Sequence, residues 1–180
     1  MAQCFEGFDL KNFWRESEYA REKYVEVAPD EQLIKEIENE LGYKLPHSYI
    51  ELMKVQNGGY PHNVCFPTNE STSWASDHVA ITGFKSIGRK KLYSLCGDLG
   101  SEFMISEWEY PKIGVYFGDC PSAGHDMICL DYRECGVDGE PQVVHVDQES
   151  DYKITFLANS FEEFVRGLRP ESDFEESEEW

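Results

Sequence analysis

"IGVYFGDCPSAGHDMICLDYRECGVDGEPQVVHVDQESDYKITFLA", residues 113–158, is the most informative stretch of the sequence, because short apolar runs alternate there with turn residues. The alternation predicts strands over 113–119, 125–133, 141–149 and 153–158. The links between them are short and rich in Pro, Gly, Asp and Ser, which is typical of antiparallel neighbours. The stretch therefore predicts a mostly antiparallel sheet.

Two helices are predicted ahead of this stretch, within residues 30–56. Asp30 has the chemistry of a helix N-cap, and Gly42 ends the apolar periodicity that follows it. A further helix begins at Pro46, where the missing N–H costs nothing. It ends at residues 57–59, Asn-Gly-Gly, where at least one residue is expected to have a positive φ.

Further elements complete the predicted order. Ser160 and Glu163 have capping-box spacing at the start of a closing helix. The remaining predictions are a helix over 11–27, a strand over 78–84 and a short helix over 100–108 capped by Ser101. Helices, then strands, then a helix predict an α+β fold: a single domain whose central, mostly antiparallel sheet packs against helices. The phosphate-binding motifs GxGxxG and GxxxxGK[ST] do not occur.

The 180 residues carry a formal charge of −19, from 35 acidic and 16 basic residues. Such a surface repels phosphate backbones and anionic membranes, so neither nucleic-acid nor membrane binding is expected. It suits a basic protein partner, or serves solubility alone. Neither a long apolar run nor a signal-peptide pattern occurs, which predicts a cytoplasmic protein whose six cysteines are reduced.

Cysteine and histidine residues between 116 and 149 raise the question of a metal site. Cys120, His125, Cys129 and Cys135 lack the tight C-x2-C pair that structural zinc sites usually contain. On one extended strand, ligands four residues apart are separated by ~13 Å, too far to share an ion. The spacing therefore predicts no metal and no cofactor.

An enzymatic role has little support in the same stretch. Cys129 lies between Ile128 and Leu130 in an acidic region, which predicts a buried, inert thiol rather than a nucleophile. Neither a nucleophile-elbow motif nor an HExxH motif occurs. The sequence predicts no catalytic residue. A small-ligand binder or hydrolase that uses a polar sheet face stays an alternative.

Period-two alternation gives each strand of 125–133 and 141–149 one apolar and one mixed face. The mixed face is expected to carry His125, Asp131, Arg133, His145 and Asp147. This pattern is typical of a sheet with helices on one side and a polar surface or groove on the other. Two interpretations stay open: a binding groove, or a solvated face with local ion pairs.

Three motifs in this order resemble the SUKH superfamily, over about residues 30–170. They are "ELGYKLPHSYIELMKVQNGGYP" (40–61), "GVYFGDCPSAGHDMICLDYRECGVDGEPQVVHVDQE" (114–149) and "LANSFEEFVRGL" (157–168). The superfamily includes the yeast regulator of cell-wall assembly and many bacterial immunity proteins. The latter are non-enzymatic and neutralise toxins, often nucleases or deaminases, by binding them.

The resemblance implies an α+β domain over 30–170, without catalytic residues. It leaves an N-terminal helical extension at 1–29 and an acidic tail at 171–180. An immunity role against a basic, nuclease-type toxin is expected, with a cell-wall assembly or regulatory scaffold as the alternative. The acids expected to form the partner-binding surface are Asp119, Asp126, Asp131, Asp138, Glu140 and Asp147.

Overall fold

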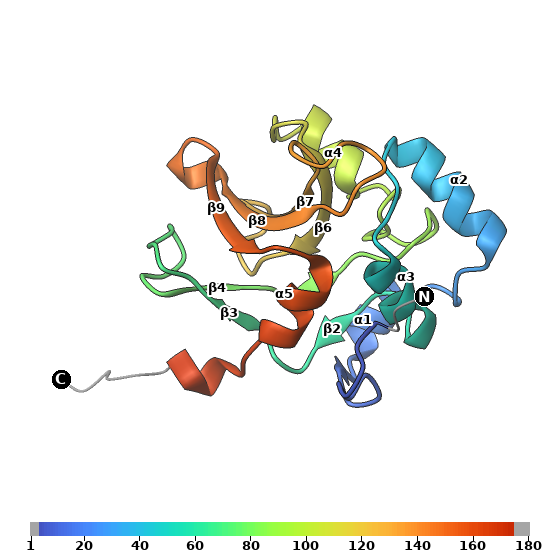
Figure 1. The fold of residues 1–180 in the computed structure, drawn as a ribbon, viewed down its shortest axis with the longest axis horizontal. Helices are drawn as coiled ribbons and strands as arrows, with labels where there is room; N and C mark the ends of the chain where they lie inside the picture. The colour runs from blue at the N-terminus through green and yellow to red at the C-terminus, as the bar shows by residue number, and fades with distance from the viewer. Residues whose placement is uncertain (1–3, 175–180) are drawn as a thin grey trace.

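Five antiparallel strands form the central sheet of the computed structural model, in which residues 4–174 are described (Figure 1). Their order across the sheet is β5-β6-β7-β8-β9, and every neighbouring pair is antiparallel. The predicted α+β fold is confirmed. The strands are β5 (Gly83–Phe84), β6 (Gly114–Asp119), β7 (Asp126–Asp131), β8 (Gln142–Asp147) and β9 (Lys153–Ala158).

Helices and two small antiparallel pairs surround this sheet (Figure 1). The pairs are β1 (Trp14–Arg15) with β2 (Tyr60–Pro61), and β3 (Cys65–Pro67) with β4 (His78–Ala80). The helices are α1 (Glu18–Lys23), α2 (Glu31–Leu41), α3 (His47–Val55), α4 (Ser101–Ser106) and α5 (Phe161–Gly167). Short 3-10 turns occur at η1 (Gln148–Ser150) and η2 (Glu171–Phe174).

Both ends of α2 and the start of α5 lie at the capping residues that the sequence predicts. Asp30 caps α2 by accepting a hydrogen bond at 2.8 Å from the amide three residues on, and Gly42 ends it with a φ of 84°. Ser160 caps α5 by accepting a hydrogen bond from the Glu163 amide at 3.2 Å. The Glu163 carboxylate accepts from the Asn159 amide at 2.8 Å, one residue earlier than in a standard capping box.

Three predicted elements differ from the structure. The helix expected over 11–27 is instead β1 followed by the short α1, because β1 pairs with β2 and Ser17 caps α1. The strand expected over 78–84 is split, because β4 pairs with β3 whereas β5 joins the central sheet. Ser101 is not the cap of α4: Gly100 holds that position, and the Ser101 hydroxyl accepts a hydrogen bond from the Tyr116 amide at 2.9 Å.

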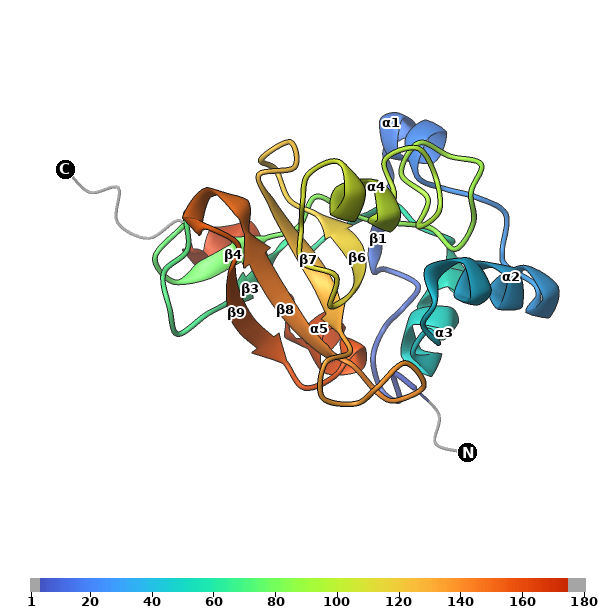
Figure 2. The same cartoon turned by 90° about the horizontal axis from the view of Figure 1, so that it is seen from above.

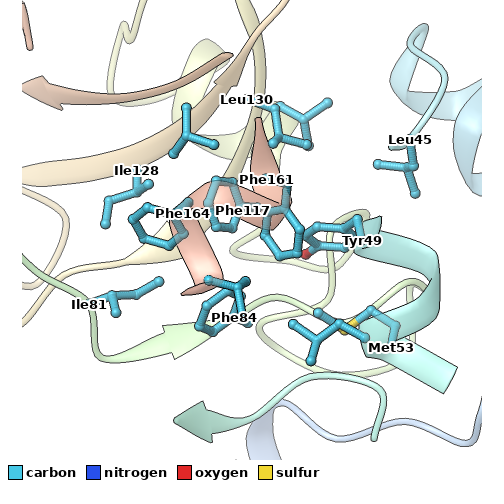
Figure 3. Packing of buried hydrophobic residues seen from close by; sticks show 14 of the residues in the cluster. Leu45, Tyr49, Met53, Ile81, Phe84, Phe117, Ile128, Leu130, Phe161 and Phe164 are labelled. Carbon is cyan, nitrogen blue, oxygen red and sulfur yellow. The ribbon is translucent and has the colours of Figure 1, made fainter. Parts of the chain in front are cut away.

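Both faces of the central sheet are covered by packed side chains. On one face, α3 and α5 pack against β6 through Tyr49, Phe117, Phe161 and Phe164 (Figure 3). On the opposite face, α4 and the chain that follows it cover the sheet. That second cluster comprises Met104, Tyr110, Tyr116, Met127, Cys129, Val144 and Val146.

The prediction that the sheet has an exposed mixed face is wrong, because all six residues of β7 and five of the six in β8 are buried. The grouping of residues also differs. Asp126 lies opposite Asp147, and Ile128 lies opposite His145. His145 and Asp147 therefore share the face of Asp126 and not that of Asp131, because paired residues point to the same side of a sheet.

Residues ahead of α2 pack onto the same core as the strands. Phe5 and Phe13 are buried within the larger hydrophobic cluster. The Phe13 ring lies 4.9 Å from Trp14 and 5.6 Å from Phe84, both in edge-on geometry. Aromatic pairs in this arrangement stabilise a core beyond the area they bury. The segment before residue 30 therefore contributes to the fold.

The acidic tail predicted at 171–180 is described only as far as η2. There the Phe174 ring stacks on His78 with centroids 4.3 Å apart, and Asp173 accepts a hydrogen bond from Arg169 at 2.8 Å. Residues 175–180 lie outside the described residues. Within residues 4–174, none of the helices has both the length and the apolar character needed to cross a membrane.

The Asn-Gly-Gly turn after α3 has the positive φ angles that the sequence predicts, 94° at Gly58 and 133° at Gly59. A Cβ atom at Gly58 would lie 2.9 Å from both the Ser86 Cβ and the Tyr24 carbonyl oxygen. Both contacts are closer than side chains tolerate without movement of the backbone. This turn therefore needs glycine for conformation and for space.

We expect Gly58→Ala to lower the free energy of unfolding by about 1–3 kcal/mol, because it adds a close contact to a strained φ. Gly42→Ala is the matched control: its φ is 84°, but nothing lies within 4 Å of the added Cβ. Thermal unfolding of both variants measures the difference. Equal melting temperatures would show that crowding at Gly58 has no energetic role.

Candidate functional site

A pocket of about 490 Å³ opens between α1, α4 and the turn that follows β6. Figure 2 shows α1 and α4 on the same side of the molecule. This volume lies within the ~300–1,000 Å³ typical of ligand pockets. Asp119 is the single charged side chain among the lining residues. The aromatic lining residues are Tyr19, Tyr24, Tyr60, Tyr93, Phe103 and Trp108.

Lys85 and Asp119 form an ion pair at the floor of this pocket. The Lys85 ammonium donates to the two Asp119 carboxylate oxygens at 2.8 and 3.0 Å and to the Leu99 carbonyl at 2.9 Å. The Tyr24 hydroxyl donates to the same carboxylate at 2.9 Å. The Lys85 side chain is 0% exposed, whereas that of Asp119 is 16% exposed and lines the pocket. The carboxylate is therefore the end of the pair that faces the pocket.

Tyrosine rings surround this ion pair. Tyr24 stacks on Tyr93 with centroids 4.6 Å apart and meets Tyr60 edge-on at 5.3 Å. Burial, followed by a hydrogen bond with the Tyr19 hydroxyl, raises the pKa of Tyr93 to about 12. Burial and the Asp119 carboxylate raise the pKa of Tyr24 well above its ordinary value. At neutral pH the phenols therefore keep their protons and present uncharged ring faces.

Two of the predicted partner-binding acids, Asp126 and Asp147, are buried at the pocket end of the sheet. Asp126 accepts a hydrogen bond from the Ser122 hydroxyl and lies 2.6 Å from His145 Nε2. Asp147 accepts hydrogen bonds from the Ser73 amide at 2.8 Å and its hydroxyl at 2.7 Å. Burial by itself would raise the pKa of Asp147, but the hydrogen bonds from Ser73 outweigh this effect and lower it. Both carboxylates thus hold local structure together.

Three other predicted acids lie at the far end of β7, whose first and last residues are roughly 17 Å apart, at a rise of ~3.3 Å per step. Asp131 is buried, and its carboxylate accepts hydrogen bonds from Arg133 at 2.7 and 3.0 Å. Asp138 and Glu140 are exposed in the turn before β8. The six acids therefore do not share one surface: Asp138 and Glu140 are exposed, Asp119 is partly buried, and the other three are buried.

One cluster of potential ligands was not found by sequence reasoning. Cys120, Asp126 and His145 each place a ligand atom within 4.8 Å of the others, and all three are buried. They come from three segments that pair across the sheet, so spacing along one strand could not reveal them. The residues whose spacing argues against a metal site, Cys120, His125, Cys129 and Cys135, do not form such a group within the described residues.

The chemistry of this cluster favours a hydrogen-bonded network. Burial, and then the neighbouring Asp126 carboxylate, raise the pKa of the Cys120 thiol well above its ordinary value. A thiol in this environment keeps its proton and is a poor nucleophile. His145 Nδ1 and the Thr155 hydroxyl, on paired positions of β8 and β9, are buried and find no hydrogen-bond partner within residues 4–174.

We expect the purified protein to contain well under one zinc ion per chain. Structural zinc sites use four ligands, whereas the described residues supply three here, one of which already bonds to Ser122 and His145. Elemental analysis, together with thermal unfolding before and after chelation, measures this. Stoichiometric zinc whose removal lowers the melting temperature would contradict the expectation.

The pocket itself was also missed at the level of sequence. Lys85 lies within "TGFKSIG" (82–88), among mostly apolar residues. A lysine in such a segment indicates a buried charge that needs a partner, and this is the one local signal of the site. Nothing in the sequence identifies Asp119, 34 residues later, as that partner. Tyr24 lies within the helix that the sequence predicts over 11–27, and no local motif distinguishes Tyr93 or Trp108.

Comparison with known protein families gives a match over most of the chain. Residues 31–165 match the SUKH_6 family model, described as SMI1-KNR4 cell-wall. The match begins with α2 and ends within α5, so it includes the whole central sheet. A search of curated proteins found no match.

Proposed function

The chain belongs to the SUKH family described as SMI1-KNR4 cell-wall, and from this premise we propose that it is a non-enzymatic protein-binding module. More specifically, we propose an immunity protein that binds and neutralises a basic, nuclease-type bacterial toxin. The family match and the net charge of −19 support this proposal together. An acidic surface accelerates association with a basic protein and competes with the phosphate groups that a nuclease binds.

The observation that carries the proposal is the exposed acidic turn before β8. Asp138 and Glu140 are exposed, although partial burial, followed by the charge of Glu162, raises the pKa of Glu140. Loops on a rigid sheet present charge to a partner with little conformational entropy to lose. We propose that these two carboxylates contribute to long-range attraction, whereas Asp126, Asp131 and Asp147 serve the fold.

The non-enzymatic part of the proposal is supported by the cysteines and histidines of the sheet. Burial raises the pKa of both Cys120 and Cys129 well above the ordinary value, and carboxylates add to the effect. A thiol nucleophile needs the opposite environment. The burial of all of β7 and of five residues in β8 argues against a hydrolase or ligand binder that uses an open polar sheet face.

A cell-wall assembly or regulatory scaffold is the second candidate, favoured by the description of the matching family. It also acts by binding proteins, so the two candidates differ in the partner. Affinity purification from the native cell, followed by mass spectrometry, separates them. An immunity protein is expected to retain one basic toxin in a stoichiometric complex, and a scaffold is expected to retain several cell-wall proteins. Recovery of the chain without either kind of protein would contradict both candidates.

We expect Asp138→Lys to slow association with the partner roughly three- to tenfold at low salt and to leave the melting temperature unchanged. The attraction acts before contact, so the effect belongs to the association rate. Stopped-flow kinetics with the co-purified partner measures it. Glu171→Lys, in η2, is the matched control, because it makes the same charge change at another exposed site. Equal association rates for the two variants would remove the turn from the interface.

A further inference from the structure

We propose that the pocket between α1 and α4 receives a cationic side chain, arginine or lysine, from the protein partner; this inference rests on the protein-binding function proposed above. The orientation of the Lys85–Asp119 pair supports it. Lys85 is completely buried behind Asp119, and its three acceptors are the two carboxylate oxygens and the Leu99 carbonyl. The negative end of this fixed dipole, the Asp119 carboxylate, therefore faces the pocket.

The aromatic walls favour the same ligand chemistry. Six aromatic side chains line the pocket, and ring faces attract cations through their quadrupoles when the centroid lies within about 6 Å. Lys85 already makes such a contact, with its ammonium 5.1 Å from the Tyr93 centroid. Leu99, Phe103 and Met104 supply apolar surface for the aliphatic stem of an arginine or lysine.

The charge around the pocket disfavours an anionic ligand. Among the lining residues there is no lysine, arginine or histidine. The segment 98–110, which contains α4, holds Asp98, Glu102, Glu107 and Glu109 and has no basic residue. A phosphate or carboxylate ligand would enter against this field without a cation to pair with. A basic partner, in contrast, is attracted by the carboxylates of this segment.

The first test uses a small probe. Two-dimensional NMR follows the Trp108 indole during titration with N-acetyl-arginine methylamide, and the uncharged N-acetyl-citrulline methylamide is the matched probe. We expect saturable shifts with the arginine compound, with a dissociation constant on the order of millimolar, and at least tenfold weaker binding of citrulline. The indole resonances of Trp14 and Trp74, which do not line the pocket, should not shift during the titration. Equal binding of both probes would overturn the proposal.

The second test uses the partner and a variant that keeps the fold. Tyr19 lines the pocket and is 49% exposed, so Tyr19→Lys adds a positive charge at its mouth without opening the core. Phe156→Lys is the matched control, because Phe156 is 50% exposed on β9 and does not line this pocket. We expect Tyr19→Lys to weaken partner binding at least tenfold and Phe156→Lys to weaken it less than threefold.

The two tests separate this inference from the proposed function. A partner that binds Tyr19→Lys as tightly as the wild-type protein overturns the cationic anchor while protein binding stands. Failure to find any protein partner overturns the proposed function, and the arginine titration then still decides whether the pocket selects cations. Selective arginine binding that Tyr19→Lys abolishes, together with selective loss of the partner, supports the proposal.

Discussion

Replacing Asp119 with alanine is expected to lower the free energy of unfolding by about 3–5 kcal/mol. The variant leaves the Lys85 ammonium fully buried with the Leu99 carbonyl as its remaining acceptor, and an unpaired buried charge is strongly destabilising. It also removes the acceptor of the Tyr24 hydroxyl. Urea unfolding followed by circular dichroism measures the loss as a lower midpoint.

Two controls show whether the ion pair is responsible. The double variant Asp119→Ala/Lys85→Met removes both charges and is expected to recover more than half of the loss, since the buried charge is gone. Glu36→Ala breaks an exposed pair with Arg89, whose atoms are 3.4 Å apart, and should cost less than about 1 kcal/mol. A loss below 1 kcal/mol for Asp119→Ala itself would show that the pair has no structural role.

Asn57→Ala is expected to cost about 3 kcal/mol or more. The side chain is 1% exposed and donates to the Val27 and Ile87 carbonyls, each at 2.9 Å. Its own oxygen accepts a hydrogen bond from the Ile87 amide at 2.8 Å. Truncation leaves the buried carbonyl and amide of Ile87, and the part-buried carbonyl of Val27, without this partner. Each unsatisfied buried group costs roughly 1–3 kcal/mol.

The control for this variant is Asn63→Ala, whose amide makes one long hydrogen bond of 3.5 Å to the Leu168 carbonyl from an exposed position. We expect it to change stability by less than about 0.5 kcal/mol. The same urea titration compares the two. Similar midpoints for both variants would mean that Asn57 does not connect the segments around Val27 and Ile87 as its contacts indicate.

Local chemistry explains which elements could be predicted from the sequence. Asp30, Gly42 and Ser160 form hydrogen bonds with residues at most four positions away. Their capping roles can therefore be predicted from the neighbouring sequence. The strands of the sheet follow the same rule, because turn residues and period-two alternation are local. The prediction of a helix over 11–27 was wrong because β1 pairs with β2, which lies more than 40 residues later in the sequence.

Relations between distant segments explain what could not be predicted. Period two assigns alternate residues to opposite sides of one strand, but only the register places His145 beside Asp126 rather than Asp131. Asp119 was predicted to lie on an exposed surface, and its placement beside Lys85 depends on where β5 joins β6. The pocket needs five separate segments of the chain to come together, so composition alone could not locate it.

We propose that this chain acts by binding one basic protein through its acidic surface. Isothermal titration calorimetry of the purified chain with its co-purified partner, between 0.1 and 1 M NaCl, measures whether charge contributes to this binding. We expect a 1:1 complex whose affinity falls at least tenfold over this range, because the Debye length falls from about 10 to about 3 Å. An affinity that does not change with salt, or a partner that is itself acidic, would contradict the account.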